Sequence, residues 1–214
     1  MKREDVLEQI KIQKPQIVYV SGKTCTGKTT FANEVHALGY QGIELDKIVA
    51  SAVVEPFNVQ PPNEAYITAY KDMGPAEHVA AFIAAVKKEI DMKISSAPIV
   101  IEGAIARSRI LKEIFSGELR DFFFVYFHPI HFEPYKERIR SRFIAGVPTN
   151  TAGLPKNFWT LVNKSDLDIF LQTLIPNEGI EKAIDDYVGI SMRGSEKRLR
   201  HFKEAFPNLH VVEV

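Results

Sequence analysis

Short apolar runs alternate along the chain with longer segments that have the spacing of amphipathic helices. The runs that have the length and composition of buried strands are 17–20, 41–45, 99–101, 122–127 and 209–214. Between them lie helical patterns, the clearest of which is an apolar stripe of Val79, Phe82, Ile83, Val86, Ile90 and Ile94 that begins after Pro75. Parallel strands need long crossover connections, which helices supply. The pattern predicts a three-layer α/β fold with a mostly parallel, five-stranded sheet.

The remaining segments complete the predicted architecture. Helices are expected over 4–10, 29–38, 107–115 and 131–143, and a last one that carries Leu199, Phe202 and Phe206 on one face. From Phe143 to Lys164 glycine and proline interrupt a polar stretch, which predicts a mobile loop or small lid at about 143–164. A chain of 214 residues then forms a single domain, 1–214, with this lid as an insert.

Charge and cysteine content narrow the class of protein. There are 27 Lys and Arg against 27 Asp and Glu, so the net charge gives no reason to expect a nucleic acid or a membrane surface as partner. The single cysteine, Cys25, excludes an internal disulfide. The first residues lack the continuous apolar stretch of a signal peptide or a membrane anchor. We therefore expect a cytoplasmic protein in which any anion binding is local.

One local motif provides such anion binding. The segment from Gly22 to Thr29 fits G-x-x-x-x-G-K-[ST] directly between a predicted strand and a predicted helix. The two glycines are expected to let backbone N–H groups face a phosphate, at the positive end of the helix dipole. Lys28 would neutralise the β and γ phosphates of ATP, and the Thr29 hydroxyl would bind Mg²⁺. The predicted nucleotide-binding residues are Gly22, Lys23, Thr24, Cys25, Thr26, Gly27, Lys28, Thr29 and Thr30.

Two acidic residues follow predicted strands at the same edge of the sheet. Asp46 comes after the second strand and Glu102 after the third. Phosphoryl transfer needs one carboxylate to orient or deprotonate the attacking hydroxyl, and another to hold the metal or its water. The alternatives are an N-cap role for Asp46, in a helix that begins near Lys47, and a solvated loop position for Glu102.

With these residues in view, the sequence resembles the P-loop nucleoside and nucleotide kinase superfamily, and within it most closely the uridine-kinase-like branch. The matching segments are 17–30, 45–46, 100–103 and 138–142. The resemblance implies a P-loop NTPase fold and ATP-dependent transfer of a phosphate to a small-molecule hydroxyl, with Mg²⁺ as cofactor. It implies that Asp46 is the base and hydroxyl anchor, and that Glu102 acts at the metal or the substrate.

Two arginines fall on one face of the predicted helix 131–143. Arg138 and Arg142 are four residues apart, a like-charge pair that is unfavourable unless an anion lies between them. Lids of the resembled kinases carry arginines that reach the transferred phosphate, which implies this role for both residues. The alternative is a solvated cationic face. Cys25 has a similar pair of interpretations, a small filler of the loop or a redox-sensitive thiol.

A second nucleotide motif leaves another function open. Residues 163–166, Asn-Lys-Ser-Asp, match the guanine-specificity motif N-K-x-D of GTPases, although Ser165 or Asp166 could instead cap a helix. A GTP-binding switch and a non-catalytic nucleotide-binding protein therefore remain alternatives to a kinase. The acceptor pocket is expected within Ala50–Gly74, where Tyr66 and Tyr70 share a helical face. The sequence leaves the acceptor and the oligomeric state open, a homodimer included.

Overall fold

A computed structural model describes residues 1–57, 75–103, 105, 107–115, 122–150 and 152–214. The chain divides into two compact units. The sheet unit contains Met1–Gly22, Gly27–Phe127 and Arg198–Glu213, and the helical unit contains Lys23–Thr26, His128–Lys197 and Val214. The prediction of a single domain over 1–214 stays a prediction.

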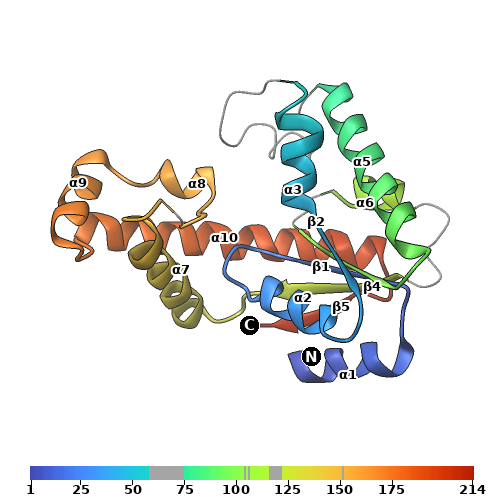
Figure 1. Cartoon of the computed structure of the whole chain (residues 1–214). Coiled ribbons are helices and arrows are strands. Elements are labelled where there is room, and N and C mark those ends of the chain that lie inside the picture. The colour runs from blue at the N-terminus through green and yellow to red at the C-terminus, as the bar shows by residue number, and fades with distance from the viewer. Residues whose placement is uncertain (58–74, 104, 106, 116–121, 151) are drawn as a thin grey trace. The chain divides into compact units, whose positions relative to one another are not determined.

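The sheet unit is built on five strands (Figure 1). They are β1 (Ile17–Gly22), β2 (Gln41–Glu44), β3 (Ile99–Glu102), β4 (Phe122–His128) and β5 (His210–Glu213), in the spatial order β2-β3-β1-β4-β5. The pairings β1–β3, β1–β4 and β2–β3 are parallel. The predicted five-stranded, mostly parallel sheet is therefore confirmed, and the carboxyl ends of these strands meet at one edge.

Helices cover both faces of this sheet. On one face, α5 (Ala76–Ile94), α6 (Ser108–Ile114) and the last turns of α10 (Glu178–Ala205) form an apolar core with Tyr19, Phe124 and Tyr126. On the other face lie α1 (Arg3–Gln13) and α2 (Lys28–His36) (Figure 1). Successive side chains of a strand point to opposite faces, so a parallel sheet covered on both sides needs apolar residues at nearly every position. The three layers are those that the sequence predicts.

The end of β2 differs slightly from the sequence prediction. The strand ends at Glu44, and Leu45 begins α3 (Leu45–Val49), which continues into a π-helical turn over Ala50–Val54. An apolar residue with the burial of Leu45 fits either a strand or a helix, so the pattern alone could not place this boundary. Asp46 is consequently the second residue of a helix.

The helical unit contains α7 (Phe132–Gly146), α8 (Lys156–Trp159), α9 (Lys164–Thr173) and the first part of α10. These helices enclose a second apolar cluster, centred on Phe143, Phe158 and Phe170. The predicted lid, 143–164, contributes Ala152, Leu154 and Phe158 to that cluster as buried side chains. Much of the segment is thus packed, and its role as a lid stays a prediction.

Among the described residues, no helix is long and apolar enough to cross a bilayer. Tyr66, Tyr70 and most of the predicted acceptor segment lie outside the described residues.

Candidate phosphate-binding site

The glycine-rich loop connects β1 to α2. Gly27 is the N-cap residue of α2 and has a φ of +88°, a left-handed conformation that favours glycine. A Cβ at Gly27 would meet no atom within 4 Å, so the backbone conformation, and not lack of space, requires glycine here. The second left-handed residue of the loop is Cys25, with a φ of +61°, whereas Gly22 is the last residue of β1. Of the two glycines expected to provide an unusual backbone conformation, Gly27 has one and Gly22 does not, and the phosphate-binding role of both stays a prediction.

Glu102 lies beside the two chemically active residues of the motif. The hydroxyl of Thr29 donates a hydrogen bond of 2.7 Å to Glu102 Oε1, and Lys28 Nζ lies 3.7 Å from the same oxygen. Only 16% of the Glu102 side chain and 18% of the Lys28 side chain are exposed, which limits solvent screening of this pair. The structure thus brings together three of the predicted site residues within the sheet unit.

The oxygen atoms of this cluster fit a magnesium ion. Mg²⁺ prefers oxygen ligands, and proteins usually hold it through one or two carboxylates together with substrate phosphates. Thr29 and Glu102 supply a hydroxyl and a carboxylate oxygen that are already adjacent. Within the described ranges no group of three or more His, Cys, Asp and Glu side chains could hold a metal by itself. A bound ion would therefore share its coordination with the nucleotide.

Asp46 stands at the same edge of the sheet. Glu44, two residues before it, is the register partner of Glu102 across β2 and β3. The helix that carries Asp46 begins against Gly103, where a Cβ would lie 2.6 Å from Leu45 Cβ. Only a glycine permits this close approach. The N-cap alternative for Asp46 is wrong, because Glu44 is the N-cap residue of α3 and Asp46 lies inside the helix, exposed to solvent.

Tyr19 is a polar residue of this region that the sequence analysis missed. Its hydroxyl donates to the carbonyl of Gly103 at 2.9 Å and accepts from the N–H of Ile105 at 3.1 Å. The side chain is fully buried, and burial raises the pKa of the phenol to about 12. The available sequence signal was a tyrosine within the otherwise aliphatic run of β1.

In the helical unit, a second tyrosine holds the middle of the loop. The Tyr135 hydroxyl donates to the carbonyl of Thr24 at 3.0 Å and lies 3.2 Å from the hydroxyl of Ser191. Burial raises the pKa of Tyr135, so its phenol stays protonated and can donate. Tyr135 therefore connects the loop to α7, the helix of the two predicted arginines. The sequence gave no indication of this role.

The two arginines of the predicted pair have different partners in the structure. Arg142 donates from Nε to the carbonyl of Ala152, and its Nη1 lies 3.7 Å from Cys25 Sγ in the loop. A Cβ at Gly153, which has a φ of +55°, would lie 2.8 Å from Arg142 Nη2. Arg138 instead donates from Nε to the carbonyl of Pro134 in its own helix, at 3.2 Å. Of these two arginines, Arg142 is the one that contacts the loop within the described part of the chain.

The four residues of the guanine-type motif begin α9. Asn163 caps this helix, because its side-chain oxygen accepts from the N–H of Ser165 at 3.0 Å. Lys164 pairs with Asp168 at 2.6 Å. The Asp166 carboxylate packs against Gly179, where a Cβ would lie 2.1 Å from Oδ2. The alternative interpretation of this segment was a helix cap on Ser165 or Asp166. A cap is present, and the residue that provides it is Asn163.

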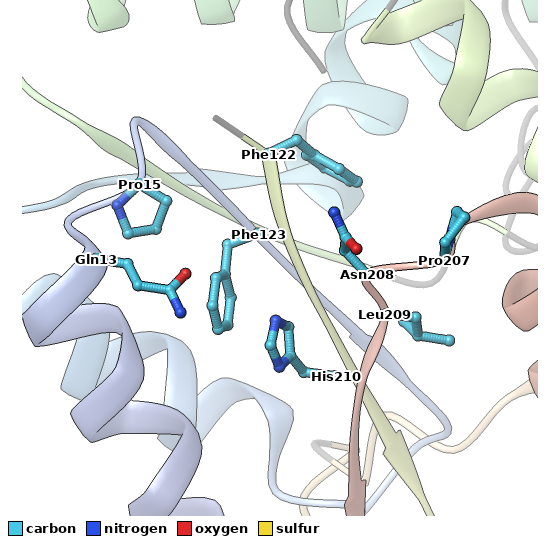
Figure 2. Close-up of a pocket in the computed structure, with 8 residues that line it drawn as sticks. All are labelled: Gln13, Pro15, Phe122, Phe123, Pro207, Asn208, Leu209 and His210. Atoms are coloured by element: carbon cyan, nitrogen blue, oxygen red, sulfur yellow. The ribbon is translucent and has the colours of Figure 1, made fainter. Parts of the chain in front are cut away.

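A cavity of about 460 Å³ lies elsewhere in the sheet unit (Figure 2). It is bordered by Pro15 before β1, by Phe122 at the start of β4, and by His210, whose ring stacks on Phe123 at a centroid distance of 3.9 Å. Burial lowers the pKa of His210. Because Pro15 precedes β1 and Phe122 begins β4, the cavity is at the amino ends of these strands, away from the residues at their carboxyl ends.

Comparisons with known proteins find distant structural similarities. No protein-family model matches the sequence, and no curated protein matches it significantly. A gluconokinase from Sinorhizobium meliloti 1021 is 15% identical over 89% of this chain and 94% of its own, with a TM-score of 0.41. A sugar kinase from Janibacter sp. HTCC2649 is 14% identical over 85% and 96%, with a TM-score of 0.42. A protein from Thermus thermophilus is 18% identical over 94% and 88%, with a TM-score of 0.43.

Similarities this distant say nothing about activity. The description of the fold therefore rests on the topology of this chain. The glycine-rich loop joins the central strand β1 to α2, and the parallel sheet that contains β1 has helices on both faces. The uridine-kinase-like branch stays a prediction. The chain has a three-layer α/β fold with a five-stranded sheet, and its resemblance to the P-loop kinase superfamily stays a prediction from the sequence.

Proposed function

We propose that this protein is a phosphotransferase that moves the γ phosphate of Mg-ATP to a hydroxyl group of a small molecule. The observation that carries the proposal is the convergence of Lys28 and Thr29 on one carboxylate oxygen of Glu102. A cation, a hydroxyl and a carboxylate are the groups that a triphosphate and its metal require, and they stand at the edge of the sheet where ligands of such folds bind.

Lys28 would neutralise charge on the β and γ phosphates, to which the N–H groups at the start of α2 also point. Thr29 and Glu102 would hold Mg²⁺. When bound, the ion supplies charge neutralisation between the phosphates. The ion pair of Lys28 with Glu102 is consistent with this division, because the lysine would exchange one anionic partner for another when a triphosphate binds.

Asp46 would accept the proton of the acceptor hydroxyl while the oxygen of that hydroxyl attacks the γ phosphorus. A phosphorus–oxygen bond forms with the acceptor, the bond to the β-phosphate oxygen breaks, and ADP leaves with its electron pair. The exposure of Asp46 at the start of α3 supports this role, since an acceptor can reach it from solvent. Arg142, beside Cys25 of the loop, would stabilise charge on the transferred group.

The alternatives predict different nucleotide behaviour. A GTP-binding switch would use 163–166 to read guanine, yet Asn163 and Lys164 already have partners within α9. A non-catalytic binding protein would bind nucleotide without transfer. The proposal therefore requires ATP to stabilise the protein at least as well as GTP does, and an acceptor to accelerate ATP consumption.

Thermal-shift measurements with Mg-ATP and Mg-GTP test the first requirement, followed by ADP release in the presence of nucleosides, nucleotides, pantothenate-like compounds and sugars. Lys28→Ala should abolish nucleotide-dependent turnover, whereas Lys47→Ala, which removes an exposed lysine paired with Glu44, should not. Stabilisation by GTP alone would favour the switch. A protein that neither nucleotide stabilises would contradict both functions.

A further inference from the structure

The position of Glu102 depends on the backbone that follows it. Glu102 is the last residue of β3, and the next N–H, that of Gly103, still donates to the carbonyl of Val20 at 3.2 Å. Beyond this bond the strand ladder ends. Leu45 packs against Gly103 from the side of α3, which leaves no room for a side chain there. Another contact must fix the segment that leaves the site.

The buried hydroxyl of Tyr19 provides this contact. It bridges the Gly103 carbonyl, at 2.9 Å, and the Ile105 N–H, at 3.1 Å, and so holds two residues of the segment that follows Glu102. Tyr19 lies on β1 opposite Ile101, one register position before Glu102. The same strand runs into the glycine loop three residues later. The Tyr19 side chain therefore links β1, the strand before the glycine-rich loop, to the segment that follows Glu102.

We propose that Tyr19 is a positioning residue, which acts through its hydroxyl to hold Glu102 where it can share a metal ion with Thr29. The inference rests on the proposed function, because it assumes that Glu102 binds Mg²⁺ together with a nucleotide. It adds a residue that touches neither nucleotide nor metal.

The hydroxyl, and not the ring, carries this role. The Tyr19 ring packs on Phe124 at a centroid distance of 4.9 Å and on Phe115 at 6.0 Å, contacts that a phenylalanine would keep. Replacement by phenylalanine would leave the Gly103 carbonyl and the Ile105 N–H buried without this partner. Buried polar groups rearrange to recover hydrogen bonds, so Gly103, Ile105 and the Glu102 carboxylate would shift.

The chain offers a matched control for the loss of a buried phenol. The Tyr40 hydroxyl, in the same unit, is buried and has no hydrogen-bond partner among the described residues. Tyr40→Phe therefore removes a phenol oxygen from the same unit and leaves the contacts of Tyr19 with Gly103 and Ile105 in place.

Calorimetric titration of the full chain with a non-hydrolysable ATP analogue, in EDTA and in Mg²⁺, tests the inference. For Tyr19→Phe we expect the affinity in EDTA to stay within about twofold of the wild type, and the gain in affinity from Mg²⁺ to fall by about tenfold. Glu102→Gln should show the same loss, and Tyr40→Phe should retain the gain. The double variant Tyr19→Phe/Glu102→Gln should lose no more than Glu102→Gln alone, because both changes act on one interaction.

A purely structural role would give a different result. Tyr19→Phe would then weaken binding equally in EDTA and in Mg²⁺, or its effect would add to that of Glu102→Gln, and either result would overturn the inference. If Tyr19→Phe does not fold, hydrogen exchange of the wild-type Ile105 amide decides, because an unprotected amide would exclude the bridge. Failure of the wild type to bind the analogue would instead contradict the proposed function, and the inference with it.

Discussion

The hydroxyl of Thr29 donates a 2.7 Å hydrogen bond to the carboxylate of Glu102, although 73 residues separate them in sequence. Lys28 approaches the same oxygen at 3.7 Å. The parallel pairing of β1 with β3 produces this contact, because it places the strand that enters the glycine loop beside the strand that ends in Glu102. The Thr29 hydroxyl and the Glu102 carboxylate, two groups suited to binding Mg²⁺, are therefore adjacent.

A double-mutant cycle tests this contact without nucleotide. Thr29→Val and Glu102→Gln should each change the free energy of unfolding, and we expect a coupling of roughly 0.5–3 kcal/mol between the two substitutions. Urea denaturation of the four proteins provides the measurement. Strictly additive effects would mean that the hydrogen bond does not contribute.

Asp46→Asn should spare nucleotide binding and abolish phosphate transfer. The amide keeps the shape of the side chain but cannot accept the proton of the attacking hydroxyl. We expect kcat to fall by about 10²–10⁴-fold, with an unchanged affinity for the ATP analogue. The matched control is Glu44→Gln, which removes another exposed carboxylate two residues away, one that pairs with Lys47 at 2.7 Å. Full activity of Asp46→Asn would remove Asp46 from the base role.

Gly103→Ala should reduce both stability and transfer. The added Cβ would lie 2.6 Å from Leu45 Cβ, so α3 must move and carry Asp46 with it. Overpacking of this kind costs about 1–3 kcal/mol, measurable as a lower urea midpoint at constant m-value. Gly42→Ala is the control, since a Cβ at Gly42 on β2 would meet no atom within 4 Å. Equal effects of the two substitutions would exclude the close approach as the cause.

Arg142→Ala should slow transfer more than Arg138→Ala. Arg142 lies beside Cys25 of the loop, whereas Arg138 donates to its own helix at Pro134. Loss of a donor that stabilises charge in the transition state costs about 10²–10³-fold in kcat, and we expect a loss of this size only for Arg142→Ala. Steady-state kinetics with the acceptor found by screening would measure it. A greater loss for Arg138→Ala would contradict the proposed role of Arg142 at the transferred phosphate.

The strands and most helices could be predicted because their periodicity reflects burial on known faces. The stripe from Val79 to Ile90 is buried in α5, and the dense aromatic run of β4 is buried on both faces. The boundary at Leu45 was one residue off, since a single buried leucine suits a strand or a helix. The choice between Asn163, Ser165 and Asp166 as cap also needed the structure, because all three residue types can accept the capping bond.

The sequence by itself determined the glycine-rich motif, the alternation of strands and helices, and the position of Asp46 and Glu102 close to the ends of two strands, because each of these is a local pattern. Tertiary structure decided which partners meet. The pairing of Thr29 with Glu102, the bridge made by Tyr19, the hold of Tyr135 on Thr24 and the contact of Arg142 with Cys25 all join residues far apart in sequence. Such contacts depend on strand order and helix packing, which no local pattern encodes.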